Sequence, residues 1–227
     1  MTALVELHHV TRAHGNGHTA AVAVRDIGCT IMPGERIAVT GPTGSGKTTL
    51  LHLIAGLDSP TAGEITWPGL GGNPLGRPGL IGLVFQEPSL LPALDVLDNV
   101  AFPLRLDGRP ADSARRHART VLEQAGIADL SERLPEELSG GQAQRVAVAR
   151  AIAVAPRLIT ADEPTGRLDT PHALAVVDLL VHAADELGAT LLLATHDPRM
   201  AERLDRHWEM RDGALTERPA EEPRRGS

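Results

Sequence analysis

Apolar residues in the first part of the chain mostly follow the two-residue period of β-strands. Alternating or continuous apolar runs bounded by glycine and proline predict strands. Such runs occupy residues 4–10, 23–31, 36–40, 63–67 and 80–85. Residues 47–57 instead have the apolar spacing of a helix that stops near Gly56. The Gly- and Pro-rich residues 67–79 indicate a surface connection rather than a separate domain.

The pattern becomes helical and amphipathic after Gln86. It predicts helices over residues 95–106 and 111–127 and a third helix after Ser139. Strands and a helix then alternate again to the end of the pattern. The strands are expected at 157–162, 190–196 and 206–213, and the helix at 171–187.

Strand–helix alternation favours a mostly parallel sheet covered by helices, and hence an α/β fold. We interpret the helical middle as an insertion into this core. The expected organisation is one domain over residues 1–218, with a helical subdomain at about 87–155 between the core segments 1–86 and 156–218. Residues 219–227, rich in Glu, Arg and Pro, are expected to form a disordered tail.

Composition narrows the possible partners. The 227 residues include 22 Lys+Arg against 29 Asp+Glu, a net charge of −7, and only 2% aromatic residues. An acidic chain lacks the basic residues that neutralise phosphates, and few aromatic rings are present to stack on bases. Nucleic acid is therefore not expected as a partner.

The single cysteine and the hydropathy pattern bear on location. Cys29 has no second cysteine to pair with, which indicates a reducing compartment and a buried structural thiol. No secretory signal is expected in the first twelve residues. The longest apolar stretch, residues 173–195, is broken by four polar residues: Asp178, His182, Asp185 and Glu186. A membrane span needs about 20 mostly apolar residues, so we expect a soluble chain anchored by another protein if it works at a membrane.

The segment GPTGSGKT, residues 41–48, fits the phosphate-loop pattern G-x-x-x-x-G-K-[ST] between a predicted strand and a predicted helix. Gly44 and Gly46 would let backbone N–H groups close around phosphate oxygens at the helix N-terminus. Lys47 can reach the β- and γ-phosphates, and the Thr48 hydroxyl can bind Mg²⁺. An ordinary glycine turn would explain neither the Lys-Thr pair nor its placement.

Two adjacent acids, Asp162 and Glu163, follow a buried strand. Ligands bind at the carboxyl ends of parallel strands, so both side chains should face the crevice of the phosphate loop. One acid can hold Mg²⁺, and its neighbour can orient the attacking water or take its proton. Alone, the pair would fit a solvated turn; beside a complete phosphate loop, a catalytic role is favoured.

A second glycine-rich helix start occurs in ELSGGQAQR, residues 137–145. Ser139 is a good N-cap, and Gly140 and Gly141 allow close approach of an anion to the helix N-terminus. A structural capped helix would explain this motif taken by itself. Because the first loop already cradles one nucleotide, the second segment could instead cover the nucleotide of another subunit.

Six motifs together resemble the ATP-binding-cassette (ABC) ATPase subunits. In chain order they are GPTGSGKT, Gln86 in GLVFQEP, LSGGQ, ITADEP, TGRLD and ATHD. The resemblance covers roughly Leu4 to Leu215, and LSGGQ is highly specific to the family. It implies a RecA-type P-loop NTPase core, an antiparallel β portion at the N-terminus and an inserted α-helical subdomain. It also implies a head-to-tail dimer with two ATP molecules sandwiched between phosphate loop and LSGGQ.

The resemblance also implies residue roles. Lys47, Thr48 and Asp162 would hold phosphate and Mg²⁺, and Glu163 would be the catalytic base. Gln86 would contact Mg²⁺ or the water and report the nucleotide state to the helical subdomain. His196 would contact the γ-phosphate, although a lone histidine at a strand end is commonly only structural. The nucleotide-binding residues would be Gly41, Pro42, Thr43, Gly44, Ser45, Gly46, Lys47, Thr48, Thr49, Ser139, Gly140, Gly141, Gln142 and Asp169.

Asp169 would lie at the dimer seam, which is compatible with a simpler role as a helix N-cap. The family usually stacks an aromatic residue, often Tyr, on adenine, but this chain has no Tyr. The corresponding position is His14, whose smaller ring predicts looser base selectivity. The neighbouring histidines have no metal-like spacing.

The leading hypothesis is an ATPase that works with a second copy of itself or a homologous ABC subunit and energises a separate transmembrane permease. Such a subunit would be cytoplasmic, peripheral on the inner face of the cell membrane. The apolar segment from Leu90 to Leu104 would form part of the permease-docking groove, or simply subdomain core. The later motifs resemble the lipoprotein-release and macrolide-export branch, whereas GLVFQEPSLLPALDVLDNVAF also resembles nitrate and sulfonate importers. Cargo and direction stay open.

Two other classes are possible. A nucleotide-dependent regulatory or scaffolding partner of a membrane complex, as in division-associated relatives, would have the same motifs. A soluble ABC ATPase of DNA repair or translation is disfavoured by the acidic balance and by the lack of tandem cassettes, coiled coils or zinc-binding insertions.

Overall fold

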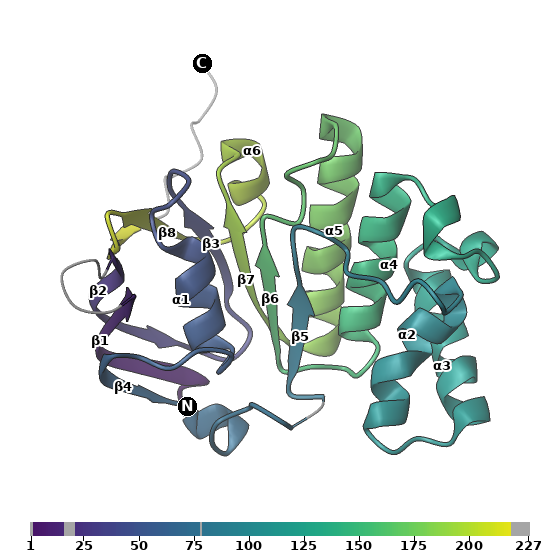
Figure 1. The fold of residues 1–227 in the computed structure, drawn as a ribbon, viewed down its shortest axis with the longest axis horizontal. Helices are drawn as coiled ribbons and strands as arrows, with labels where there is room; N and C mark the ends of the chain where they lie inside the picture. Colours follow the sequence, from purple (N-terminus) through teal and green to yellow (C-terminus); the bar gives the residue numbers. More distant parts are fainter. Residues whose placement is uncertain (1, 16–20, 78, 219–227) are drawn as a thin grey trace.

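Two β-sheets form the core of the computed structural model, which describes residues 2–15, 21–77 and 79–218 (Figure 1). The smaller sheet is antiparallel with strand order β2-β1-β4, and the larger sheet has the order β5-β6-β7-β3-β8-β9. The small sheet comprises β1 (Val5–His14), β2 (Ala21–Ile31) and β4 (Ala62–Thr66). The large sheet comprises β3 (Arg36–Thr40), β5 (Ile81–Val84), β6 (Leu158–Asp162), β7 (Thr190–Thr195), β8 (Arg206–Arg211) and β9 (Ala214–Arg218).

The prediction of a mostly parallel sheet is confirmed, because β5, β6, β7, β3 and β8 all pair in parallel. The antiparallel strand β9 was not predicted. It forms a hairpin with β8 through Asp212 and Gly213, which both have positive φ, at 49° and 82°. The Asp-Gly pair is the sequence signal of such a turn.

Alternate residues of the central strands face two separate hydrophobic clusters. Ile37, Val39 and Leu192 pack with α1 (Lys47–Ile54) and with the small sheet. Ala38 and Leu193 point to the opposite face and pack with α5 (Thr170–Leu187). The apolar runs are therefore continuous because both faces of the sheet are covered. Helix α1 lies between the two sheets (Figure 1).

A third cluster belongs to the helices beyond α5 (Figure 1). It is formed mainly by α2 (Val96–Leu106), α3 (Ala111–Gln124) and α4 (Gly140–Ile152), which confirms the three predicted helices. The subdomain boundaries at about 87 and 155 stay a prediction. The expected tail, residues 219–227, lies outside the described residues.

The short helices were not predicted. They are the four-residue α6 (Pro198–Ala201) and the 3-10 turns η2 (Pro68–Leu70), η3 (Ala128–Leu130) and η4 (Pro135–Glu137). Helix α6 begins with Asp197 as N-cap and proline at its first position, which is a start signal in the sequence.

The expectations about the single cysteine and about membrane-spanning segments can be compared with the structure. Cys29 is partly buried, and burial raises the pKa of its thiol to about 12, which fits a structural rather than a nucleophilic cysteine. Among the described residues, no helix has both the length and the apolar character needed to cross a membrane.

Two leucines of α2 test the packing of the helical region. Leu104 is completely buried, whereas Leu106 on the same helix is 64% exposed. Leu104→Ala should lower the free energy of unfolding by about 2–5 kcal/mol, because it leaves a cavity. The matched change Leu106→Ala should stay within about 0.5 kcal/mol in the same denaturant titration. Equal effects of the two substitutions would contradict the packing described for α2.

Candidate active site

Strand register brings the predicted site residues to one edge of the large sheet. Thr40 of β3 pairs with Thr195 of β7, and Asp162 of β6 pairs with Ala194. The residues that follow these three strands therefore emerge side by side. They are the phosphate loop from Gly41, Glu163, and His196. This is the edge at which parallel α/β sheets bind ligands.

The phosphate loop is packed tightly against the protein's own backbone at two glycines. A Cβ atom on Gly46 (φ 104°) would lie 2.1 Å from the Ala23 carbonyl oxygen, and one on Gly41 would lie 2.2 Å from the Met210 carbonyl oxygen. Gly44, also with positive φ, has open space around its Cβ position. The backbones of β2 and β8 therefore support the loop on its inner side, at Gly46 and Gly41.

The middle of the loop faces outward, whereas Ser45 and Lys47 are buried. Pro42, Thr43 and Gly44 are exposed, whereas Ser45 is only 4% exposed. The Ser45 hydroxyl has no hydrogen-bond partner among the described residues. A buried hydroxyl without a partner is unusual and is available to a bound oxygen atom.

Lys47 and Thr48 open helix α1 and reach toward the two acids at the end of β6, Asp162 and the following Glu163. The Lys47 ammonium donates to the carbonyl oxygens of Gly41 (2.9 Å) and Pro42 (3.1 Å) and lies 3.4 Å from Glu163 Oε1. The Thr48 hydroxyl donates to Asp162 Oδ2 at 2.7 Å. The predicted juxtaposition of loop and acids is thus present in the structure.

Asp162 has an environment suited to a cation. One of its oxygens accepts from Thr48, and the other, Oδ1, is buried and finds no hydrogen-bond partner in the described parts of the chain. Burial raises the pKa of this carboxyl, and the Thr48 hydrogen bond only partly opposes that rise. A carboxylate and a hydroxyl are oxygen ligands of the kind that Mg²⁺ prefers. These two side chains therefore fit a magnesium site.

Glu163 is held by two partners and by an unusual backbone. Its Oε2 lies 2.8 Å from His196 Nδ1, and its Oε1 faces Lys47. Its φ is 45°, a left-handed conformation that costs a glutamate of order 1–3 kcal/mol. A hydrogen bond from its N–H to the Ala194 carbonyl oxygen (2.9 Å) holds this conformation. Strain of this kind is typical of functional positions.

Gln86 and His14 lie on opposite sides of this group of residues, one after β5 of the large sheet and the other at the end of β1 of the small sheet. Gln86 follows β5 and is exposed, and its amide lies against Gly166, where a Cβ atom would be 2.9 Å from Gln86 Nε2. His14 ends β1, and its Nε2 lies 3.4 Å from the Thr49 hydroxyl at the start of α1. The ring is therefore beside the phosphate-loop helix, as the prediction of an adenine-stacking residue requires.

The LSGGQ segment is not brought to the phosphate loop. Ser139 caps α4, and its hydroxyl accepts from Gln142 N (3.3 Å) while Gln142 Oε1 accepts from Ser139 N (2.9 Å). Helix α4 packs on α5, α2 and β5, whereas α1 packs on β6, β7 and β2. Figure 1 shows the strands and α5 between these two helices. Ser139 and Gly140 are exposed, so this capped helix start is open to a partner.

Asp169 is the N-cap of α5, as its simpler interpretation predicted. Its Oδ1 accepts from His172 N (3.0 Å) and lies 2.6 Å from His172 Nδ1. These contacts lower the pKa of Asp169, the backbone hydrogen bond contributing most. A Cβ atom on Gly141 would lie 3.0 Å from the His172 ring, so the LSGGQ segment rests on the start of α5.

Sequence reasoning missed several residues that hold these segments in place. The fully buried Asn99 binds the Leu91 backbone and accepts and donates hydrogen bonds near the start of α2. Arg150 of α4 donates to the carbonyl oxygens of Pro88 and Ser89, just after Gln86. In the sequence, Asn99 and Arg150 are simply polar residues within helical patterns. Nothing in those patterns identifies the backbone groups that they bind.

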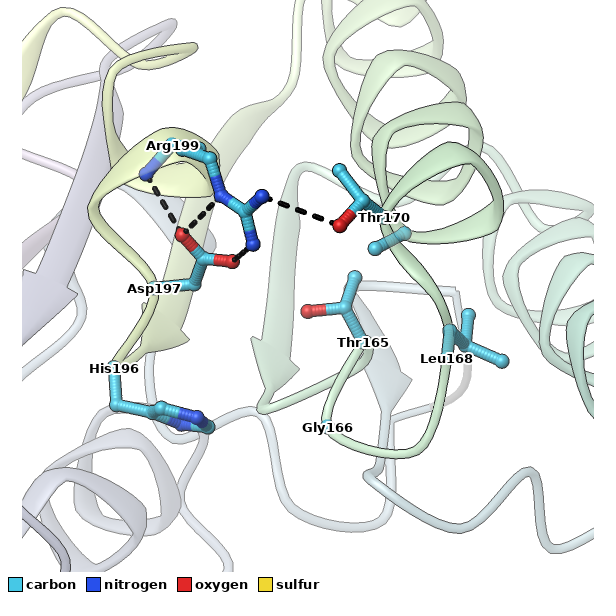
Figure 2. A pocket seen from close by; sticks show the side chains of 8 residues that line it. Thr165, Gly166, Leu168, Thr170, His196, Asp197 and Arg199 are labelled. Carbon is cyan, nitrogen blue, oxygen red and sulfur yellow. Dashed lines mark hydrogen bonds and ion pairs between the residues drawn. The ribbon is translucent and has the colours of Figure 1, made fainter.

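Figure 2 shows a small cavity beside His196, also missed from sequence. Its volume is about 120 Å³, and it lies between the end of β7 and the segment that follows Glu163. Its lining residues are Thr165, Gly166, Leu168, Thr170, Ala173, His196, Asp197 and Arg199. Asp197 and Arg199 form an ion pair at 2.7 Å, and the Arg199 hydrogen bond lowers the pKa of Asp197.

The sheet edge therefore combines a glycine-rich loop, a lysine, a threonine–aspartate pair and a glutamate–histidine pair. These groups can bind polyphosphate, hold a divalent cation and accept a proton from water. Fold and site together define a P-loop nucleoside triphosphatase with an antiparallel N-terminal sheet and a helical insertion.

Comparisons with known proteins give the family. A profile described as ABC transporter matches residues 24–166. The lipoprotein-releasing system ATP-binding protein LolD of Shewanella sp. (strain MR-7) is 36% identical over 222 residues, covering 93% of this chain and 95% of the relative. An uncharacterised ABC transporter ATP-binding protein of Mycobacterium tuberculosis is 39% identical over 219 residues, covering 93% and 88%.

A solved structure agrees with this result. The ATP-binding cassette MJ0796, a dimer in a post-hydrolysis state bound to ADP and Pi, superposes with a TM-score of 0.84 at 35% identity. The superposition covers 94% of this chain and 98% of that chain. The chain belongs to the ABC transporter family, as an ATP-binding ATPase subunit. The predicted resemblance, fold class and enzyme class are thereby confirmed.

Asp162 offers a test of the site that needs no nucleotide. Because its pKa is raised, the folded protein loses stability as pH rises above the ordinary aspartate range, where the unfolded chain releases its proton more readily. Asp162→Asn removes this buried charge. Without Mg²⁺ at neutral pH, the variant should therefore melt at a higher temperature than wild type.

The advantage of Asp162→Asn should shrink toward acid pH, where the wild-type carboxyl is already protonated. Asp129→Asn makes the same chemical change at an exposed position and should leave the melting temperature unchanged. A variant less stable than wild type at neutral pH would show that Asp162 is not a desolvated charge.

Proposed function

We propose that two copies of this subunit, or one copy and a homologous subunit, close head to tail over two ATP molecules and energise a separate membrane permease. The observation that supports this arrangement most directly is the separation of the two anion-binding helix starts. The phosphate loop and the capped LSGGQ segment belong to helices packed on different parts of the fold. A second protomer can supply the missing half of each site.

The phosphate loop would hold ATP in each site. Its backbone N–H groups and the Lys47 ammonium would bind the β- and γ-phosphates, and His14 would stack on adenine. The partner's LSGGQ segment, Ser139 to Gln142, would cover the γ-phosphate. The dimeric MJ0796 cassette bound to ADP and Pi supports this use of the fold.

Mg²⁺ would be held by the Thr48 hydroxyl and by Asp162, with Gln86 as a further oxygen ligand. When bound, the ion would neutralise charge on the β- and γ-phosphate oxygens. Asp162 Oδ1, which has no hydrogen-bond partner within residues 2–15, 21–77 and 79–218, fits such a ligand role. Gln86 would report occupancy to the helical region through the segment anchored by Asn99 and Arg150.

Glu163 would act as the general base. It would take a proton from the attacking water while the water oxygen bonds to the γ-phosphorus and the bond to the β–γ bridging oxygen breaks, releasing ADP and phosphate. His196 would orient the Glu163 carboxylate and contact the γ-phosphate. Asp169 would lie at the seam between the protomers.

The permease would dock near the segment from Leu90 to Leu104. A second cavity of about 330 Å³ lies here, lined by Glu87, Pro88, Ser89, Leu90, Pro135, Ala143 and Arg167. Phe102 belongs to the segment from Leu90 to Leu104, and Leu134 directly precedes Pro135 of the cavity lining. Both are large apolar side chains left exposed, at 36% and 38%. Attachment to a permease would place the subunit peripherally on the cytoplasmic face of the membrane.

Glu163→Gln provides the test of hydrolysis and dimer closure. It keeps the size of the side chain but removes the base, so turnover should fall at least about 100-fold while ATP still binds. The trapped subunit should elute as an ATP-dependent dimer in size-exclusion chromatography. Glu202→Gln, at an exposed glutamate of the same chain, should leave both properties unchanged. Full hydrolysis by the Glu163 variant would remove that residue from its proposed role.

Phe102→Asp tests the docking surface. The change puts a charge into the proposed permease contact, so co-purification of a membrane partner with the tagged subunit should drop several-fold. ATP hydrolysis by the isolated subunit should be unchanged. Leu57→Asp makes a comparable change at a side chain 42% exposed after α1 and should keep the partner. Equal loss with both variants would argue against docking at Phe102.

A further inference from the structure

The two segments at the cavity of Figure 2 are joined by one guanidinium group. Arg199 donates from Nε (3.1 Å) and Nη2 (2.7 Å) to the two carboxylate oxygens of Asp197. Its third nitrogen, Nη1, donates to the Thr170 hydroxyl at 3.2 Å. Within the described part of the chain, this is the sole hydrogen bond between residues 165–170 and residues 197–203.

Both ends of this bridge adjoin residues with a proposed role. Asp197 directly follows His196, and its N–H donates to the Thr195 hydroxyl at the end of β7 (3.1 Å). Thr170 directly follows Asp169, the N-cap of α5. A two-pronged contact with Asp197 fixes the plane of the guanidinium, so its third nitrogen has one direction in which to donate.

The bridge is too exposed to matter much for folding. The Arg199 side chain is 60% exposed, and surface ion pairs contribute little to stability. The cavity below it also means that side-chain packing does not fill the space between the two segments. Farther from the cavity, Met200 and Ala201 of α6 pack in the same buried cluster as Ala173 of α5. Beside the cavity itself, Asp197 and Thr170 are joined by the polar contact through Arg199.

We propose that Arg199 is a positioning residue that holds the His196 segment and the Asp169 segment at a fixed separation through Thr170. The inference rests on the proposed function, in which His196 meets the γ-phosphate and Asp169 meets the partner subunit. Closure of the partner at Asp169 is then transmitted to the histidine beside Glu163. Arg199 acts through these residues and does not touch the nucleotide.

Thr170 allows a matched pair of variants to test the bridge. Thr170→Val keeps the shape but removes the acceptor for Arg199, whereas Thr170→Ser keeps the hydroxyl. Thr170→Val and Arg199→Ala should each lower kcat about fivefold, which corresponds to about 1 kcal/mol. Arg199→Lys, which keeps the charge without the fork, should resemble Arg199→Ala. Thr170→Ser should restore a kcat close to that of wild type.

Two further measurements separate positioning from a general structural effect. ATP affinity of the isolated subunit, measured with a fluorescent nucleotide, should be unchanged in all variants because the phosphate loop is untouched. Arg203→Ala is the control, since Arg203 also pairs with α5, through Asp178 at 3.1 Å, with both side chains about half exposed. It should keep wild-type kcat and ATP affinity.

The inference is overturned if Thr170→Val and Thr170→Ser have the same kcat, or if Arg203→Ala lowers kcat as much as Arg199→Ala. In either case the proposed function would still be supported if the wild-type subunit hydrolyses ATP and forms an ATP-dependent dimer. A wild-type subunit that neither hydrolyses ATP nor dimerises would overturn the proposed function, and this inference with it.

Discussion

The alignment of three parallel strand ends is the constraint on which the site depends. Because β3, β7 and β6 pair in parallel, Lys47, Glu163 and His196 converge although the sequence separates them widely. A one-residue slip of β6 against β7 would turn the Asp162 carboxylate toward the opposite face of the sheet. The fully buried β7, covered on both sides, fixes the register. The chemistry of the edge is thus a consequence of core packing.

The same arrangement explains why one chain has two anion-ready helix starts. Helix α1 is enclosed between the sheets, and α4 lies beyond α5 with the helical region. Both helix starts pack closely on the fold, one on the backbone of β2 and β8 and the other on His172 of α5. In the proposed dimer, two such preformed surfaces would meet without large rearrangement of either, which lowers the entropic cost of binding.

Much of the fold and site could be predicted because the signals are contiguous in sequence. The phosphate loop, the capped α4 and the buried strands each depend on neighbouring residues, so short patterns identify them. The Asp-Gly turn of β9 and the Asp-Pro start of α6 were also local signals, and both were overlooked. Contacts such as Arg199 with Thr170 could not be predicted, because they depend on where β7 and α5 meet. The roles assigned to Asn99 and Arg150 likewise follow only from tertiary packing.

The close approach at Gly41 and Gly46 has a consequence for comparing this chain with its relatives. A side chain there would clash with the main-chain oxygens of Ala23 and Met210, which belong to the fold itself. A descendant that had lost all catalytic ability would still need both glycines to fold. In a relative that has lost other site residues, these two glycines therefore indicate that the fold is kept. They do not indicate that the relative still hydrolyses ATP, which has to be judged from other positions.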